Sequence, residues 1–256
     1  MKTKFGMRAL SLLLVIALAG AVFVPAVSAV ENEQLIIKEK TQKISQSIDA
    51  STPWNSKASA TIEDKIDSVL MNTMLIKSYG ISTLNVQPIR TDTLDVPDDG
   101  KSSAAGSYKL YQVNEQDSNY DYYILWMKAT GMNNDEGLIP SYLREVKPGI
   151  SLTSSNERIT DWEPITDTST SSPVTITASL EVTHGPATAS VSQMFDLQSG
   201  HVGPDDLYTS SYGYFRPHWN GNYQGSQGLI GGAEFRVPQG GGYHYDITLD
   251  VTGAGY

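Results

Sequence analysis

Strict alternation of apolar and polar residues is the feature that most constrains how this chain of 256 residues can fold. In residues 174–183, apolar side chains at every even position alternate with Thr, Ser or Glu at every odd one. Shorter alternation follows at 187–192, after the turn sequence His184-Gly185-Pro186. A period of two sends successive side chains to opposite faces, which is the pattern of a half-buried strand. Residues 174–192 therefore predict a β-hairpin.

Three further segments predict strands. Residues 120–128 (YDYYILWMK) are apolar on both faces, which predicts a central strand with Trp126 nearly fully buried. Residues 243–252 alternate, and residues 233–237 lie between glycine clusters. Several strands with one apolar face each need a second sheet to cover them. We therefore predict a mainly β fold, an antiparallel β-sandwich domain over residues 107–256.

The chain before that domain has a different character. Residues 30–80 are predicted to be helical, because Ile37, Ile44 and Ile48 follow a helical spacing. In the same segment, Thr61 and Asp64 resemble a capping box before an apolar face over residues 62–70.

Two segments predict irregular structure. Residues 81–106 contain Pro88, Pro97 and Gly100 and end in a run of small residues, so we predict a linker. Residues 151–172 are rich in Ser and Thr, and we predict a long surface loop there.

Residues 1–29 have the pattern of a secretory signal peptide. Lys2, Lys4 and Arg8 precede an apolar run over residues 9–24, and Val27-Ser28-Ala29 fits a cleavage site. We expect a secreted or cell-surface protein, and an uncleaved anchor helix is the alternative. The chain has no cysteine, which excludes thiol catalysis, thiolate metal sites and a lipid-modified cysteine.

Charge and motifs narrow the function classes. The formal net charge of −10 disfavours nucleic-acid binding, because the phosphate backbone repels an acidic chain. The sequence has no G-x-S-x-G elbow, no phosphate-binding Walker loop and no H-E-x-x-H pair. These absences favour a non-enzymatic protein. A secreted hydrolase acting on carbohydrate stays an alternative, and it would need two carboxylates facing one cleft.

Two residue types offer metal ligands. Four histidines, His184, His201, His218 and His244, lie in the last part of the chain without the close spacing of a metal site. Acidic clusters occur at residues 95–99, 133–136 and 205–206. Such loops can bind calcium weakly outside the cell, and each can equally be a solvated turn.

The candidate ligand-binding segment is residues 207–225, where large rings alternate with Gly, Asn and Ser. Rings in a polar loop can stack on sugars, lie at a lipid headgroup or contact another surface protein. Adjacent rings should face opposite ways in an extended segment, so we expect Trp219 to be partly exposed. The alternative is that the rings cover the core. The predicted ligand-binding residues are Tyr212, Tyr214, Phe215, His218, Trp219 and Tyr223.

Two functions follow from these patterns. The first is an exported, non-enzymatic binding or structural module that uses the aromatic segment. The second is a membrane-active protein that uses the 174–192 hairpin, because about ten residues per strand with one apolar face suit a membrane-inserting hairpin.

Overall fold

The computed structural model describes residues 38–53, 60–64, 66–67, 86–114, 117–134, 140–184, 187–205 and 213–255. They belong to one compact unit, Lys38–Tyr256, and almost all of their regular structure is β. The expected leader and predicted site residue Tyr212 lie outside the described residues. The strands are β1 (Lys38–Asp49), β2 (Val86–Val96), β3 (Ser102–Val113), β4 (Tyr120–Asn133), β5 (Tyr142–Leu152), β6 (Arg158–Glu163), β7 (Thr168–Thr170), β8 (Val174–His184), β9 (Ala187–Leu197), β10 (Gly200–Pro204), β11 (Tyr214–Phe215), β12 (Pro217–Tyr223), β13 (Ser226–Pro238) and β14 (His244–Gly255).

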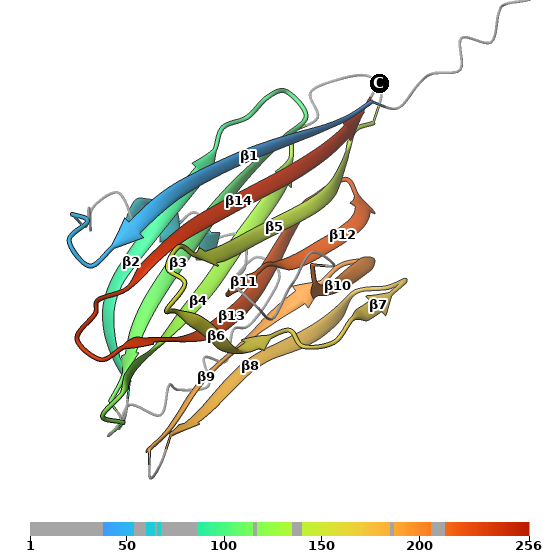
Figure 1. The fold of residues 1–256 in the computed structure, drawn as a ribbon. Coiled ribbons are helices and arrows are strands. Elements are labelled where there is room, and N and C mark those ends of the chain that lie inside the picture. Colours follow the sequence, from blue (N-terminus) through green and yellow to red (C-terminus); the bar gives the residue numbers. More distant parts are fainter. Residues whose placement is uncertain are drawn as a thin grey trace, which may run out of the picture. The chain divides into compact units, whose positions relative to one another are not determined.

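These strands form three antiparallel sheets (Figure 1). The largest has the order β1-β14-β5-β12-β10-β7, with β11 also paired to β5. A five-stranded sheet has the order β2-β3-β4-β13-β6, and β8 and β9 form the third sheet. The predicted mainly β, antiparallel fold class is confirmed, and the arrangement as a sandwich stays a prediction.

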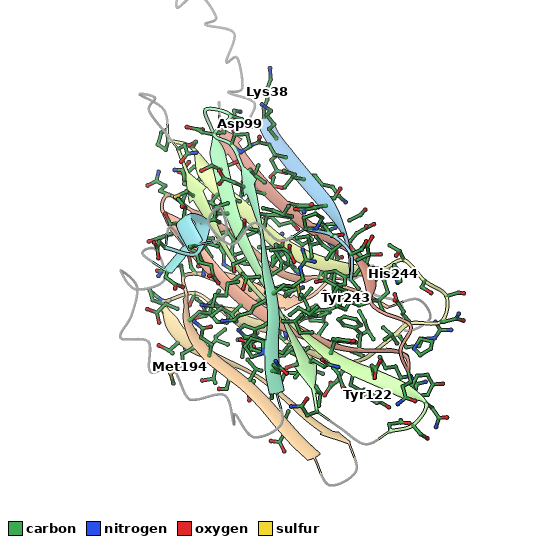
Figure 2. The ribbon with its side chains drawn as sticks, turned by 90° about the vertical axis from the view of Figure 1, so that its left-hand side faces the viewer. Lys38, Asp99, Tyr122, Met194, Tyr243 and His244 are labelled. Atoms are coloured by element: carbon green, nitrogen blue, oxygen red, sulfur yellow. The ribbon has the colours of Figure 1, made fainter. Side chains whose placement is uncertain are left out.

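Side chains of the two larger sheets meet in one core. The Tyr108 hydroxyl on β3 donates a hydrogen bond to the Thr248 carbonyl on β14. On β4, a Cβ added to Gly131 would lie 2.3 Å from Val146 Cγ2 on β5, so only glycine fits this close approach. Figure 2 shows the side chains that fill the region between the strands.

The central-strand prediction is confirmed at β4. This strand is the middle member of its sheet, between β3 and β13, and side chains from Tyr122 to Met127 are buried on both faces. Trp126 is 3% exposed. The 233–237 and 243–252 predictions are also confirmed, because these residues lie within β13 and within β14 with its preceding turn.

The predicted N-terminal helix is wrong for residues 38–49, which form β1. Ile44 and Ile48 pair with Leu249 and Tyr245 of β14. Residues four apart share one face of a strand as well as one face of a helix, so their spacing did not decide between the two. The second helical prediction is confirmed over residues 60–64 and 66–67, where Ile66 is fully buried.

The predicted linker at 81–106 is also wrong where it is described, because it contains β2 and the start of β3. Pro88 is tolerated because β2 is an edge strand whose register shifts between Pro88 and Arg90. Ala104 and Ala105 are fully buried, so these small residues serve close packing in a strand.

The predicted surface loop at 151–172 contains strand structure too. β5 continues to Leu152, and β6 and β7 follow. β6 pairs with β13 and β7 pairs with β10, which extends each large sheet at one edge. The part of the chain that the structure describes contains no helix with the length and apolar character required to cross a membrane.

Candidate functional site

The predicted hairpin is confirmed, and among the described strands it forms a sheet of its own that shares no backbone pairing with the two larger sheets. β8 and β9 pair from Val174↔Leu197 to His184↔Ala187, and each strand has 11 residues. No backbone ladder connects either strand to a third one in the described part of the chain. The hairpin packs against β13 and β6 (Figure 1), and Met194 marks β9 in Figure 2.

The two faces of this hairpin differ sharply. Residues directly opposite one another in an antiparallel pair share a face. The face toward the core carries five side chains that are at most 3% exposed: Ala178, Leu180, Val191, Phe195 and Leu197. On the other face of β8, the exposed residues are Thr175, Thr177, Ser179 and Glu181.

Side chains supply the polar attachments between the hairpin and the rest of the unit. Trp126 Nε1 donates to Gln193 Oε1 at 3.4 Å. The buried Gln227 amide donates to the Asp196 carbonyl at 2.8 Å and accepts from the Gln198 N–H at 3.0 Å. The Ser179 N–H donates to the Glu163 carboxylate, whose pKa burial raises. These contacts hold the hairpin in place without a shared strand ladder.

β7 and β10 form the base of the hairpin. β7 precedes β8 in the chain, and β10 follows β9. β7 and β10 pair with each other, and β10 pairs with β12 on its other side. At this base His201 Nε2 lies 3.2 Å from Asp167 Oδ1, and His201 Nδ1 hydrogen-bonds with Ser169 Oγ at 2.9 Å. The Asp167 side chain is 60% exposed, so the contact lacks the buried acid of a hydrolytic triad.

His218 on β12 is the second histidine at this base. Its ring centroid lies 5.4 Å from that of His201, and its buried Nδ1 has no hydrogen-bond partner among the described residues. Burial lowers the pKa of His218, and the positive charges of Lys147 and His201 lower this pKa further. Sequence spacing did not predict this pair, because antiparallel pairing of β10 with β12 brings the two rings together.

The aromatic segment is placed differently from the prediction. Phe215 and Trp219 are fully buried, so the predicted partial exposure of Trp219 is wrong. Tyr214, His218 and Tyr223 are half-buried. Alternation along β12 sends Trp219 into the core and His218 toward the surface. Ligand binding by this segment stays a prediction, and only the half-buried side chains are placed to contact a ligand.

The histidines and acidic loops do not converge on a metal centre among the described residues. His244 Nδ1 lies 3.4 Å from Glu157 Oε1. His244 is on β14 and pairs with β1, whereas His201 and His218 are on the paired strands β10 and β12. In the 95–99 cluster, Asp98 accepts from the Gly100 N–H and Asp99 accepts from the Lys101 and Ser102 N–H groups. These carboxylates stabilise a turn, and weak calcium binding stays a prediction.

Comparison with known proteins gives distant structural likeness and no sequence match. No protein-family model and no curated protein sequence matches the chain. Among solved structures, the chain is similar to Clostridium perfringens delta-toxin, with 10% identity and a TM-score of 0.41. The match covers 70% of this chain and 95% of the toxin chain. A likeness of this degree establishes neither a family nor a function for this chain.

Proposed function

We propose that this protein is membrane-active, and that the β8–β9 hairpin leaves its position on β13 and inserts its apolar face into a bilayer. The observation that carries the proposal is the separate two-stranded sheet, whose apolar face is buried and whose polar attachments come from side chains. The proposal rests on this geometry and on the physical properties of the two faces.

The hairpin dimensions suit a membrane. Each strand has 11 residues, and a tilted strand needs about 9–11 residues to cross the hydrocarbon core. The face with Ala178, Leu180 and Val191 suits lipid, and the face with Thr175, Thr177 and Ser179 suits water. The outer edges of an inserted hairpin need hydrogen-bond partners, so hairpins of several copies must pair edge to edge.

Leaving the body has a free-energy cost with an apolar and a polar part. The apolar face of the hairpin exchanges a protein core for lipid tails and is not returned to water, whereas the body side chains beneath it, Trp126 among them, lose their apolar cover. The lost polar attachments are the hydrogen bonds of Gln193, Gln227 and Ser179, and each contributes about 0.5–1.5 kcal/mol net. A strand within a larger sheet would lose a whole backbone ladder as well.

A reversible crosslink tests this proposal. The chain has no cysteine, so the variant Glu163→Cys/Ser179→Cys contains only two thiols, one on β6 and one on β8. A crosslinker can therefore tether the hairpin to the body at this one place. The tether is closed with a short thiol-specific crosslinker that contains a reducible disulfide, and mass spectrometry verifies closure. Release of a dye from lipid vesicles is then measured. We expect release by the open form, none by the closed form, and recovery after reduction.

The single variants Glu163→Cys and Ser179→Cys, treated with the same reagent, are the matched controls and should both release dye. Equal dye release by the open and closed forms would contradict the proposal, because the hairpin would not need to move. Absence of release by the wild-type protein from neutral and anionic vesicles alike would contradict it as well.

A second candidate function is an exported surface-binding module that uses the remaining aromatic segment. The half-buried Tyr214, His218 and Tyr223 favour this function, because each presents part of a ring to solvent. A glycan array with the wild-type protein and Tyr223→Ala tests it. Wild-type binding that is lost in the variant supports the module, and absence of wild-type binding to any glycan contradicts a carbohydrate ligand.

A further inference from the structure

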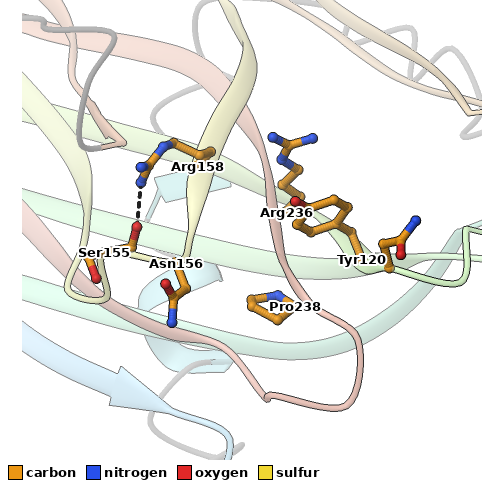
Figure 3. A pocket seen from close by; sticks show the side chains of 7 residues that line it. Tyr120, Ser155, Asn156, Arg158, Arg236 and Pro238 are labelled. Atoms are coloured by element: carbon orange, nitrogen blue, oxygen red, sulfur yellow. Dashed lines mark hydrogen bonds between the residues drawn. The ribbon is translucent and has the colours of Figure 1, made fainter.

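An open pocket of about 590 Å³ lies at the end of β13, where β4 begins and where the β5–β6 connection turns (Figure 3). Two arginines, two asparagines and one aromatic ring face it. The lining residues are Asn119, Tyr120, Ser155, Asn156, Arg158, Arg236 and Pro238. Among the described residues, no carboxylate lines this pocket, so this part of the lining does not offer the acid pair of a glycosidase.

Strand register explains why the two arginines are neighbours. Arg158 on β6 is the direct partner of Arg236 on β13, so both side chains leave the same face of the sheet. Like charges directly opposite each other destabilise an antiparallel pair. Neither guanidinium has a carboxylate within ion-pair distance among the described residues. Arg236 interacts with the Tyr122 hydroxyl, which in turn donates a hydrogen bond to Asp117.

Neighbouring groups hold both guanidinium groups. Arg158 Nη1 donates to the Ser155 and Glu157 carbonyls, at 2.7 Å each, which fixes its position at the β5–β6 connection. The Arg236 guanidinium carbon lies 4.2 Å from the centroid of the Tyr120 ring, within the range of a cation–π contact. Each arginine has five N–H donors, so donors stay available for a ligand.

We propose that this pocket binds a phosphate group between Arg158 and Arg236. Paired guanidinium groups match the several oxygens of a phosphate, and a bound anion would offset the repulsion between the two charges. The pocket is larger than a phosphate ion, so the phosphate would belong to a larger compound or to a lipid headgroup. This proposal does not depend on movement of the hairpin.

Binding is tested in two arms with the full chain. In the first arm, isothermal titration calorimetry measures binding of inorganic phosphate and of glycerol 3-phosphate. In the second, co-sedimentation measures binding to phosphatidylcholine vesicles with and without phosphatidic acid. Arg158→Gln/Arg236→Gln should weaken binding by about tenfold or more in at least one arm, which corresponds to about 1.4 kcal/mol. Arg158→Lys/Arg236→Lys should retain part of the binding, because it keeps the charge but not the planar fork.

Arg144→Gln is the matched control, because Arg144 on β5 lies outside the pocket and pairs with Glu39 at 3.6 Å. It removes one positive charge outside the pocket, against two in the double pocket variant, and should bind like the wild type. Pocket-dependent binding of glycerol 3-phosphate supports a soluble phosphate ligand, and pocket-dependent binding confined to phosphatidic acid vesicles supports a lipid headgroup. Equal losses in Arg144→Gln and the pocket variants would overturn the proposal. Absence of pocket-dependent binding in both arms, with thermal unfolding unchanged, would also overturn it.

Discussion

At the scale of single residues, the Trp126 indole connects the core to the hairpin. Trp126 on β4 lies directly opposite Gly232 on β13, and a Cβ added to Gly232 would lie 2.5 Å from the indole ring. The same Cβ would lie 3.6 Å from Leu180 of the hairpin, and the indole N–H donates to Gln193. A glycine at position 232 therefore leaves the space that the ring occupies beneath the hairpin.

This packing predicts a specific coupling between two substitutions. Trp126→Ala should lower the free energy of unfolding by about 3–5 kcal/mol, because it leaves a cavity in a central strand. Gly232→Ala should lower it by about 1–3 kcal/mol through overpacking. In the double variant the added methyl group enters the vacated space, so the combined loss should be smaller than the sum. Urea unfolding measures all three, and strict additivity would show that the ring does not occupy this space.

Sequence alone predicted the burial of Trp126 but not that of Trp219. Both faces of residues 120–128 are apolar, so any strand at this position would bury Trp126. In the pair His218–Trp219, alternation requires that one ring faces inward and the other outward, and it does not decide which one. The inner ring is Trp219, because its strand is covered on that side by the core.

At the scale of elements, strands with strict alternation or two apolar faces were predictable, and β1, β2 and β7 were not. The hairpin at 174–192 has one apolar and one polar face, and only a half-buried strand satisfies that pattern. β1 is an edge strand exposed over most of its length, so its two buried or half-buried isoleucines fitted a helix equally well. The pairing of β7 with β10 depends on contacts distant in sequence, and local patterns do not encode it.

The base of the hairpin should respond to pH through His218. The groups that face it are Lys147 and Glu145 of β5, His201 of β10 and Asp205 after β10. A histidine whose pKa is lowered by folding is held neutral in the folded state. Its contribution to stability is therefore complete above about pH 6.5, the pKa of an unfolded histidine, and is lost as the pH falls below that value. We expect the His218 contribution to lower the free energy of unfolding from pH 7.5 to pH 5, while the raised pKa values of Glu157 and Glu163 act in the opposite direction.

Urea unfolding of His218→Gln over the same pH range checks this assignment. The variant should lose less stability on acidification than the wild type, because glutamine does not take up a proton. Lys147→Gln should also reduce the pH dependence, since it removes a positive charge that lowers the pKa of His218. Parallel pH profiles for the wild type and His218→Gln would exclude His218 as the source of this pH response.

At the scale of the whole molecule, the chain combines a net charge of −10 with a local pair of arginines. An acidic protein is repelled by anionic surfaces at long range, so the pocket can act only after close approach. Raising the ionic strength screens the long-range repulsion more strongly than short contacts inside the pocket. A phosphate group, rather than a diffuse anionic surface, is therefore the ligand that this charge distribution can select.

Residues 1–29 predict that the protein is exported, which would bring either proposed function to a surface outside the cytoplasm. Expressed with its leader, the protein should appear outside the cytoplasm, and its intact mass should be that of a chain that begins at Val30. Ala29→Leu places a larger side chain directly before the expected cut and should block cleavage, so this variant should keep the leader and sediment with membranes. An extracellular wild-type protein whose mass retains residues 1–29 would contradict cleavage. A wild-type protein that keeps the leader in the membrane fraction would favour an anchor helix instead.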